Sequence, residues 1–437
     1  MAGHRARAGP EALRIDAATA QVSWLLVPAG SVLVVAAVAA TAARGLADPP
    51  VAVAFGLFIA FGELVRVTLP GDREAAPLAA AGALGYALLS DVRGAASSHD
   101  ALEVVAVTAC GMLLGALPHV AAGRSPRLDY LARRVLTMGL AAGLFRPFYA
   151  GGPLNTLSDD SPVLFAGLMV VVITAAGVVD AGLAAMVRAG RDGAPFVATM
   201  CDELCALLGI GSAIGATGML IALAIEAMYL WALPVFAIPL LLAQFSFRRY
   251  AAIRSTYLQT IRALSRVTEL GGYTETGHAR RVSRLSVAVG RELGLSERQL
   301  RSLEYAALMH DIGQLSLADP IPGGATVMAT RHEQRRIAEL GARVIRQTGV
   351  LDDVATIVER QAEPYRRAHV SNESEVPLAS RIIRAANAYD DLAGGSVETA
   401  RRLHALERLR LGTVHDYDPR VVESLSRVVE RATRLGT

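Results

Sequence analysis

The stretch Tyr305-Ala306-Ala307-Leu308-Met309-His310-Asp311-Ile312-Gly313 decides how the C-terminal part of this chain is interpreted. It ends an apolar helical run with an adjacent His–Asp pair, so an imidazole and a carboxylate stand side by side. Proteins use both groups as ligands for divalent metal ions. A second histidine, His278, precedes the pair in Thr276-Gly277-His278-Ala279-Arg280. If an earlier helix brings His278 to the pair, the three side chains predict a metal site.

Several segments around the pair, in matching order, resemble the HD superfamily of metal-dependent phosphohydrolases, and within it the HD-GYP type that hydrolyses cyclic di-GMP. The resemblance covers roughly residues 268–432 and implies an all-helical domain with a metal site. Among its segments are Tyr273–Val282, Leu308–Gln314, Gly341–Ile345, Pro377–Asp390 and Asp418–Val422. Apart from this resemblance, apolar residues recur with helical period over residues 280–434, with Ser296 as a helix cap, and this pattern predicts an all-α fold.

The resemblance also implies that several family positions have changed in this chain. It puts Ile337, Gln361 and Ala362 where such domains carry metal-binding histidines. Asn387 stands in place of the final aspartate ligand. Gln314 stands in place of a lysine that contacts phosphate. These changes predict a degenerate site.

The Gly-Tyr-Pro loop is also missing from the shorter stretch over residues 365–375. The residual metal-ligand candidates are His278, His310 and Asp311, with the neutral Asn387 as a weak fourth. A site with two or three ions needs more carboxylates and imidazoles, and activation of water depends on the charge of those ions. We therefore expect no assigned catalytic residue and no cofactor; the alternative is one divalent Mn, Fe or Zn ion. Without an ion, Asp311 would accept from an imidazole and Asn387 would donate its amide.

Composition indicates a membrane-embedded N-terminal part. The chain has 437 residues, of which 53% are hydrophobic, more than a soluble enzyme of this size usually carries. The excess precedes residue 247, in eight apolar stretches near the length that crosses a bilayer. They lie at about 22–43, 50–69, 75–90, 101–122, 131–149, 162–187, 198–224 and 228–246.

Arginine placement predicts how these spans are oriented. Arginines gather in the N-terminal tail, in alternate loops and directly after the last span. The positive-inside rule then places both termini in the cytoplasm, which requires an even number of spans in the cytoplasmic (inner) membrane. The predicted parts are a cytoplasmic tail (1–21), a membrane domain of about eight helices (22–246), a helical linker (247–270) and a degenerate HD-GYP-like domain (271–437).

The linker carries apolar residues at a spacing near 3.5: Ile253, Tyr257, Ile261, Leu264 and, less regularly, Val267 or Leu270. This stripe predicts either a short parallel coiled coil that joins two copies of the chain into a homodimer, or a single helix that packs on the soluble domain. The sequence leaves both open, because the linker is short.

Three functions from different classes compete. The first is a membrane-anchored signalling or regulatory protein whose domain has lost hydrolysis and binds a nucleotide or a signalling protein, or dimerises. The second is a divergent metal-dependent phosphohydrolase that acts on a nucleotide such as cyclic di-GMP through His278, His310 and Asp311. The third is a sensor or transporter with an HD-fold appendage, for which Asp180 in the sixth span is the main support. A net charge of +3 without a basic stripe gives no reason to expect a nucleic-acid partner.

Overall fold

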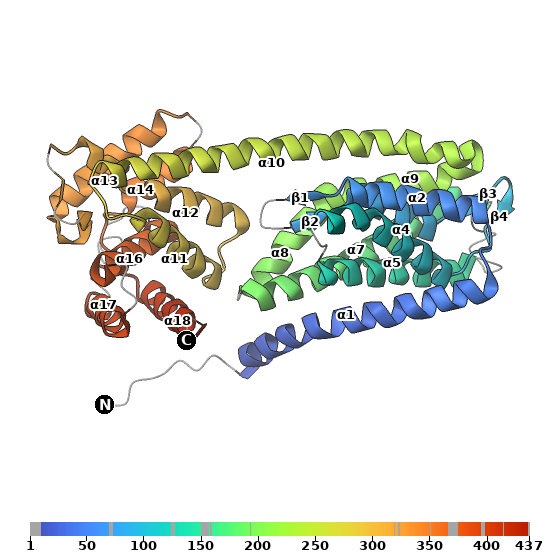
Figure 1. The fold of residues 1–437 in the computed structure, drawn as a ribbon, viewed down its shortest axis with the longest axis horizontal. Helices are drawn as coiled ribbons and strands as arrows, with labels where there is room; N and C mark the ends of the chain where they lie inside the picture. Colours follow the sequence, from blue (N-terminus) through green and yellow to red (C-terminus); the bar gives the residue numbers. More distant parts are fainter. Residues whose placement is uncertain are drawn as a thin grey trace. The chain divides into compact units, whose positions relative to one another are not determined.

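Helices make up nearly all of the computed structural model (Figure 1), which confirms the predicted all-α class. Within the described residues, strands are limited to two short antiparallel hairpins, Val67–Leu69 with Arg73–Ala75 (β1, β2) and Asp91–Val92 with Ala95–Ala96 (β3, β4). The structure describes residues 10–69, 73–123, 127–149, 157, 160–192, 194–318, 320–321, 324–349, 351–365, 375–394, 398–413 and 415–435. Most of the stretch 365–375, from which the Gly-Tyr-Pro loop is missing, lies outside these residues.

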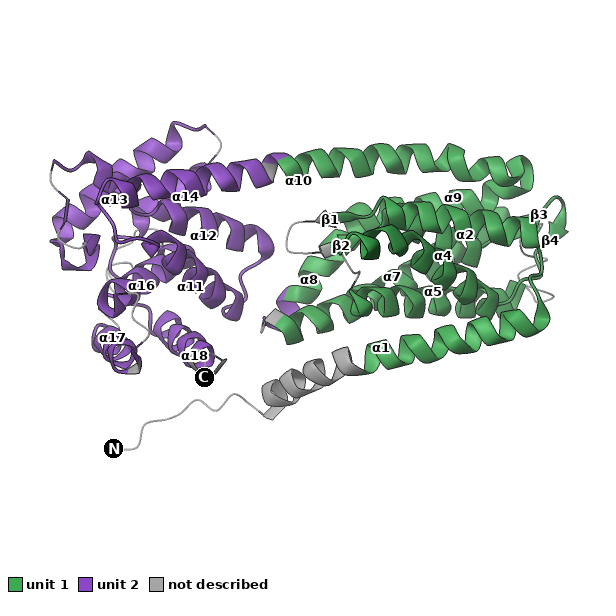
Figure 2. Cartoon of the chain, in the orientation of Figure 1, with its two compact units in different colours: residues 1–192, 199–252 green, residues 193–198, 253–437 purple. Residues whose placement is uncertain are grey.

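The chain divides into two compact units (Figure 2): residues 1–192 with 199–252, and residues 193–198 with 253–437. In the first unit, helices occupy the predicted apolar stretches. They are α1 (Pro10–Arg44), α2 (Pro49–Leu64), α3 (Pro77–Ala87), α4 (Ala101–Ala121), α5 (Leu128–Tyr149), α7 (Pro162–Asp192), α8 (Phe196–Ala206), α9 (Ser212–Met228) and the first part of α10 (Ala232–Leu270). A π-helical turn, Leu207–Gly211, joins α8 to α9, and a 3-10 turn, Tyr229–Trp231, joins α9 to α10.

Four helical segments in the described part of the chain are long and apolar enough to cross a membrane, by length and composition alone. They are Leu25–Arg44, Ala101–Ala121, Pro162–Arg191 and the run Phe196–Leu270, which includes α8, α9 and α10 with the two turns that join them. The helices α2 and α3 have 16 and 11 residues, fewer than the roughly 20 that one helical crossing takes. The count of eight spans and their orientation stay predictions.

Two acidic side chains of the first unit have arginine partners on neighbouring helices. Asp180 of α7 lies 2.9 Å from Arg133 of α5, and Glu203 of α8 lies 2.9 Å from Arg188 of α7. All four side chains are largely buried, where an unpaired charge would be costly. The Asp180 pair therefore joins α7 to α5, and the Glu203 pair joins α8 to α7.

The second unit consists of the C-terminal part of α10 and a bundle of shorter helices. These are α11 (His278–Glu292), α12 (Glu297–Met309), α13 (Arg331–Arg346), α14 (Asp352–Arg360), α16 (Leu378–Ala393), α17 (Thr399–Leu411) and α18 (Pro419–Leu435), with 3-10 turns η3 (Ile312–Ser316) and η5 (Thr326–Met328). Their apolar faces enclose one core, with Val282, Leu303, Val358, Ile382 and Leu425 at its centre.

Local signals fix where several of these helices begin. Ser296 caps α12 as predicted: its hydroxyl accepts from the backbone N–H of Gln299, whose side chain accepts from the backbone of Ser296. Thr330 begins α13 with the same arrangement. Gly277 has a φ of +80°, which favours glycine, and it turns the chain into α11 directly before His278.

The predicted linker lies within α10, which is helical through all of it. Ile261 is buried in the core of the second unit, whereas Ile253, Tyr257 and Leu264 of the predicted stripe are exposed. The apolar stripe of α10 is therefore packed on its own domain along one edge and exposed along the other.

Candidate metal centre

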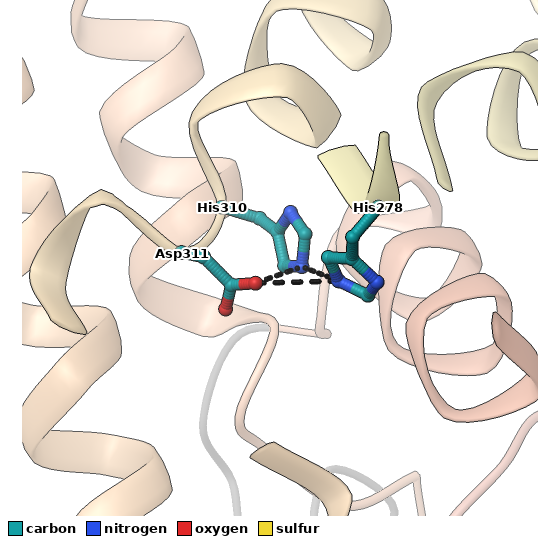
Figure 3. Close-up of side chains that lie close together, drawn as sticks. All are labelled: His278, His310 and Asp311. Carbon is teal, nitrogen blue, oxygen red and sulfur yellow. Dashed lines mark hydrogen bonds and ion pairs between the residues drawn. The ribbon is translucent and has the colours of Figure 1, made fainter. Parts of the chain in front are cut away.

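His278, His310 and Asp311 meet in the interior of the second unit (Figure 3). His278 is the first residue of α11, His310 directly follows α12, and Asp311 leads into η3. The helices α11 and α12 pack on each other, which brings the start of one next to the end of the other. The structure thus brings together the three residues that the sequence singles out as metal-ligand candidates.

The three ligand atoms form a tight triangle. His310 Nε2 lies 3.1 Å from Asp311 Oδ2, and His278 Nε2 lies 3.3 Å from it. The two Nε2 atoms are 3.4 Å apart, and all three side chains are buried. Two imidazoles and a carboxylate in this arrangement are a donor set that suits one zinc, iron or manganese ion.

Hydrogen bonds on the far side of each ring turn both Nε2 atoms toward Asp311. His278 Nδ1 lies 2.8 Å from a carboxylate oxygen of Asp390. His310 Nδ1 lies 2.9 Å from the backbone oxygen of Ala307. Both partners are acceptors, so each Nδ1 carries a proton, and in a neutral ring the Nε2 lone pair then remains for a metal ion.

The Asp311 carboxylate gives a further sign that the residues fit a metal ion. Its Oδ2 is buried and has no partner with hydrogen-bond geometry among the described residues, although both imidazoles lie close to it. A buried acceptor without a partner costs free energy, and a cation held by the three side chains would remove that cost. His278, His310 and Asp311 therefore fit one divalent ion, which favours the alternative that the sequence left open.

In the absence of an ion, protons compete for the same atoms. Burial works against protonation of His278, but the nearby Asp311 carboxylate and the hydrogen bond to Asp390 outweigh it and raise the pKa of His278 to about 10. Burial likewise opposes a charge on His310, yet the Asp311 carboxylate raises its pKa above the usual value. Burial alone would raise the pKa of Asp311, but the two imidazoles hold it far below its usual range. A metal ion must therefore displace protons from this site.

Asn387, the weak fourth candidate, turns its oxygen toward the site. Its Oδ1 lies 3.1 Å from His310 Nε2, while its amide donates to the hydroxyl of Thr326 at 2.8 Å. The amide thus donates, as we expected for the ion-free site, and its acceptor is Thr326. An oxygen in this position can add one neutral ligand.

A pocket adjoins the site and contains the positions where the sequence predicts lost histidines. Ile337, Gln361 and Ala362 line it together with His310 and Asp311. The Gln361 amide donates to the backbone oxygen of His310 at 2.8 Å. The remaining lining residues are Thr326, Val327, Gln334, Arg384, Asn387, Ala388 and Tyr417.

Gln314 has a different place. Its side chain is fully buried, its two amide atoms have no hydrogen-bond partner among the described residues, and it is not part of the pocket lining. It therefore does not stand where it could contact a phosphate in this pocket. The structure offers no compensating partner for the two amide atoms within the described chain.

Two carboxylates next to the site were missed by the sequence reasoning. Asp390 is bonded to His278 as described above, and Asp391 Oδ1 lies 3.8 Å from His278 Nδ1. Burial raises the pKa of Asp391 to about 6. Both follow Asn387 by three and four positions, which places them near it on the same side of α16. This spacing from Asn387 was the sequence signal that could have identified the two carboxylates as neighbours of the site.

Comparisons with known proteins identify the domain that contains these residues. Residues 263–421 match the family described as HD domain. The chain is 26% identical over 184 residues to the cyclic di-GMP phosphodiesterase response regulator RpfG of Xanthomonas campestris pv. campestris (strain 8004). The match covers 39% of this chain and 47% of that protein, so the chain spans about half the length of the curated relative it matches. No solved structure matches the chain. The second unit thus contains an HD-superfamily domain.

Proposed function

We propose that this chain is a membrane-anchored signalling protein whose HD domain holds one divalent ion through His278, His310 and Asp311 and acts by binding rather than by hydrolysis. The observation that carries the proposal is the composition of the adjoining pocket. Apart from His310 and Asp311, none of the described residues that line it is a His, Cys, Asp or Glu. This composition supports a site for one ion, and the described lining offers no such ligand to a second ion.

The pocket lining also includes the guanidinium of Arg384, whose N–H donors already have partners. The Arg384 side chain donates to the backbone oxygens of Ala362 at 3.0 Å and Asp416 at 3.1 Å. Burial lowers the pKa of its guanidinium. When bound, a divalent ion attracts phosphate oxygens and polarises them, but the donors of the Arg384 side chain already serve backbone oxygens rather than face a leaving group. These contacts favour retention of a phosphate-bearing ligand over its cleavage.

Membrane anchoring and the ligand class rest on separate support. Four apolar helical segments precede the domain or lead into it, and the arginine pattern favours a cytoplasmic domain. The matched relative is named a cyclic di-GMP phosphodiesterase. We therefore propose a nucleotide of that class as the ligand.

A second candidate function is hydrolysis with a single ion. The geometry of the three side chains favours it. The Nδ1 hydrogen bonds fix the orientation of both imidazole rings, and Asp311 Oδ2 has no hydrogen-bond partner among the described residues. Such an arrangement also suits the activation of water. Both candidate functions use the same three metal-binding residues, and only the second includes cleavage of the bound nucleotide.

Binding and cleavage of cyclic di-GMP by the full chain in detergent, with Mn²⁺ supplied, distinguish them. We expect Mn²⁺-dependent binding without product, and loss of that binding in His310→Ala and Asp311→Ala variants. His404→Ala, which changes an exposed histidine on α17, should behave like the unmodified chain. Turnover that disappears in the first two variants would establish the hydrolase instead, and the absence of any binding would refute the proposed ligand.

A further inference from the structure

Asp390 joins two helices at the back of the metal site. Its carboxylate, on α16, accepts the Nδ1 proton of His278, the first residue of α11, at 2.8 Å. The same carboxylate takes two bonds from Arg281: Nε lies 2.8 Å from Oδ1, and Nη2 lies 2.9 Å from Oδ2. Because a guanidinium that binds in this two-point manner fixes the plane of a carboxylate, Asp390 has one defined orientation toward His278.

Arg281 is itself held on its other side. It donates to the Glu275 carboxylate at 2.7 Å and to the backbone oxygen of Thr276 at 3.0 Å. Both partners belong to the turn between α10 and α11. A continuous series of bonds thus runs from this turn through Arg281 and Asp390 to His278.

The two histidines of the site differ in how their rings are fixed. His310 uses the backbone oxygen of Ala307, three positions earlier in its own helix. His278 depends on a side chain of another helix. The neighbouring Asp391 is a poor substitute, since one of its oxygens accepts from the backbone of Val327 and the other lies 3.8 Å from His278. The orientation of His278 therefore rests on Asp390.

We infer that Asp390 is a positioning residue for the metal site, which fixes the ring of His278 with Nε2 toward the ion, and that Arg281 holds Asp390 in place. The inference rests on the proposed function, because it needs an ion at His278, His310 and Asp311. A carboxylate behind a ligating imidazole sets the position of its proton, limits ring rotation and strengthens its donor nitrogen. Loss of such a partner typically lowers metal affinity about 10- to 100-fold.

Affinity for Mn²⁺ alone, measured by calorimetry on the full chain in detergent, tests the inference in Asp390→Ala and Asp390→Asn variants. The absorption spectrum of bound Co²⁺ provides a second readout, because it reports the ligand geometry. Asp418→Asn is the matched control. Asp418 is also buried and also pairs with an arginine, Arg381 at 2.8 Å, but it neither touches His278 nor lines the pocket.

We expect Asp390→Ala to weaken Mn²⁺ binding about 10- to 100-fold and to change the Co²⁺ spectrum. Asp390→Asn should have a smaller effect, because an amide keeps one acceptor oxygen. Asp418→Asn should lower the melting temperature but leave affinity and spectrum unchanged. Unchanged affinity in Asp390→Ala, or an equal loss in Asp418→Asn, would overturn the positioning role alone. Failure of the unmodified chain to bind Mn²⁺ or Co²⁺ would refute the metal site and the proposed function with it.

Discussion

At the scale of single residues, Asp311 is the group on which the site depends. It lies within 3.3 Å of both imidazoles, and in the ion-free protein its negative charge offsets theirs. Asp311→Ala should leave the buried imidazoles without the negative charge that offsets theirs and cost about 1–3 kcal/mol of folding free energy. Thermal melts of the full chain with and without Mn²⁺ measure this cost. A variant as stable as the unmodified chain, and still stabilised by Mn²⁺, would contradict the assignment.

His278 should give the ion-free protein a pH dependence of its own. Burial disfavours its charge, but Asp311 and Asp390 raise its pKa from 6.5 to about 10 on folding. A group whose pKa is raised by folding stabilises fully below its unfolded value, and the gain is lost as pH rises through the folded value. Stability in the presence of a chelator should therefore decline from about pH 6.5 to about pH 10.

The decline can be measured by chemical denaturation at several pH values in that window. His278→Gln removes the titrating ring, and it should flatten this part of the stability profile. Groups elsewhere in the chain titrate in both proteins, so the difference between the two profiles isolates His278. Profiles that fall in parallel would show that this histidine is not the cause.

At the scale of helices, features with local causes could be predicted from the sequence and features that depend on distant partners could not. Ser296 caps α12 as predicted because its partner, Gln299, lies three positions away. The burial of Ile261 could not be predicted, because an apolar spacing near 3.5 does not show which residues of α10 pack on the domain. Asp390 was missed for a similar reason: its partner His278 lies on a helix far away in sequence.

The exposed apolar face of α10 predicts contact between two copies of the chain. Ile253, Tyr257, Leu264 and Val267 are 43–55% exposed and follow the 3–4 spacing of a coiled coil. In a chain freed of its native cysteines, Leu264→Cys should therefore form cross-linked dimers in membranes. Gln259→Cys, exposed on another face of the helix, is the control. Equal cross-linking at both positions would contradict a specific homodimer.

At the scale of the whole molecule, the arginine pattern predicts that both ends of the chain lie on the same side of the membrane. Reporter fusions after Arg14 and after Arg254 should both report the cytoplasm, because the positive-inside rule applies to each of these segments. An external signal at either position would require an odd number of spans. It would also place the HD domain outside the cytoplasm, away from the nucleotide that we propose as its ligand.

The central claim is that His278, His310 and Asp311 hold one divalent ion, and the metal content of the purified full chain tests it most directly. After equilibration with Mn²⁺ and removal of free ions, elemental analysis should find about one ion per chain, because the donor set supports a single site. His310→Ala and Asp311→Ala should lose the ion, and His404→Ala should keep it. An unmodified chain without metal, or one that retains its metal in the first two variants, would contradict the claim.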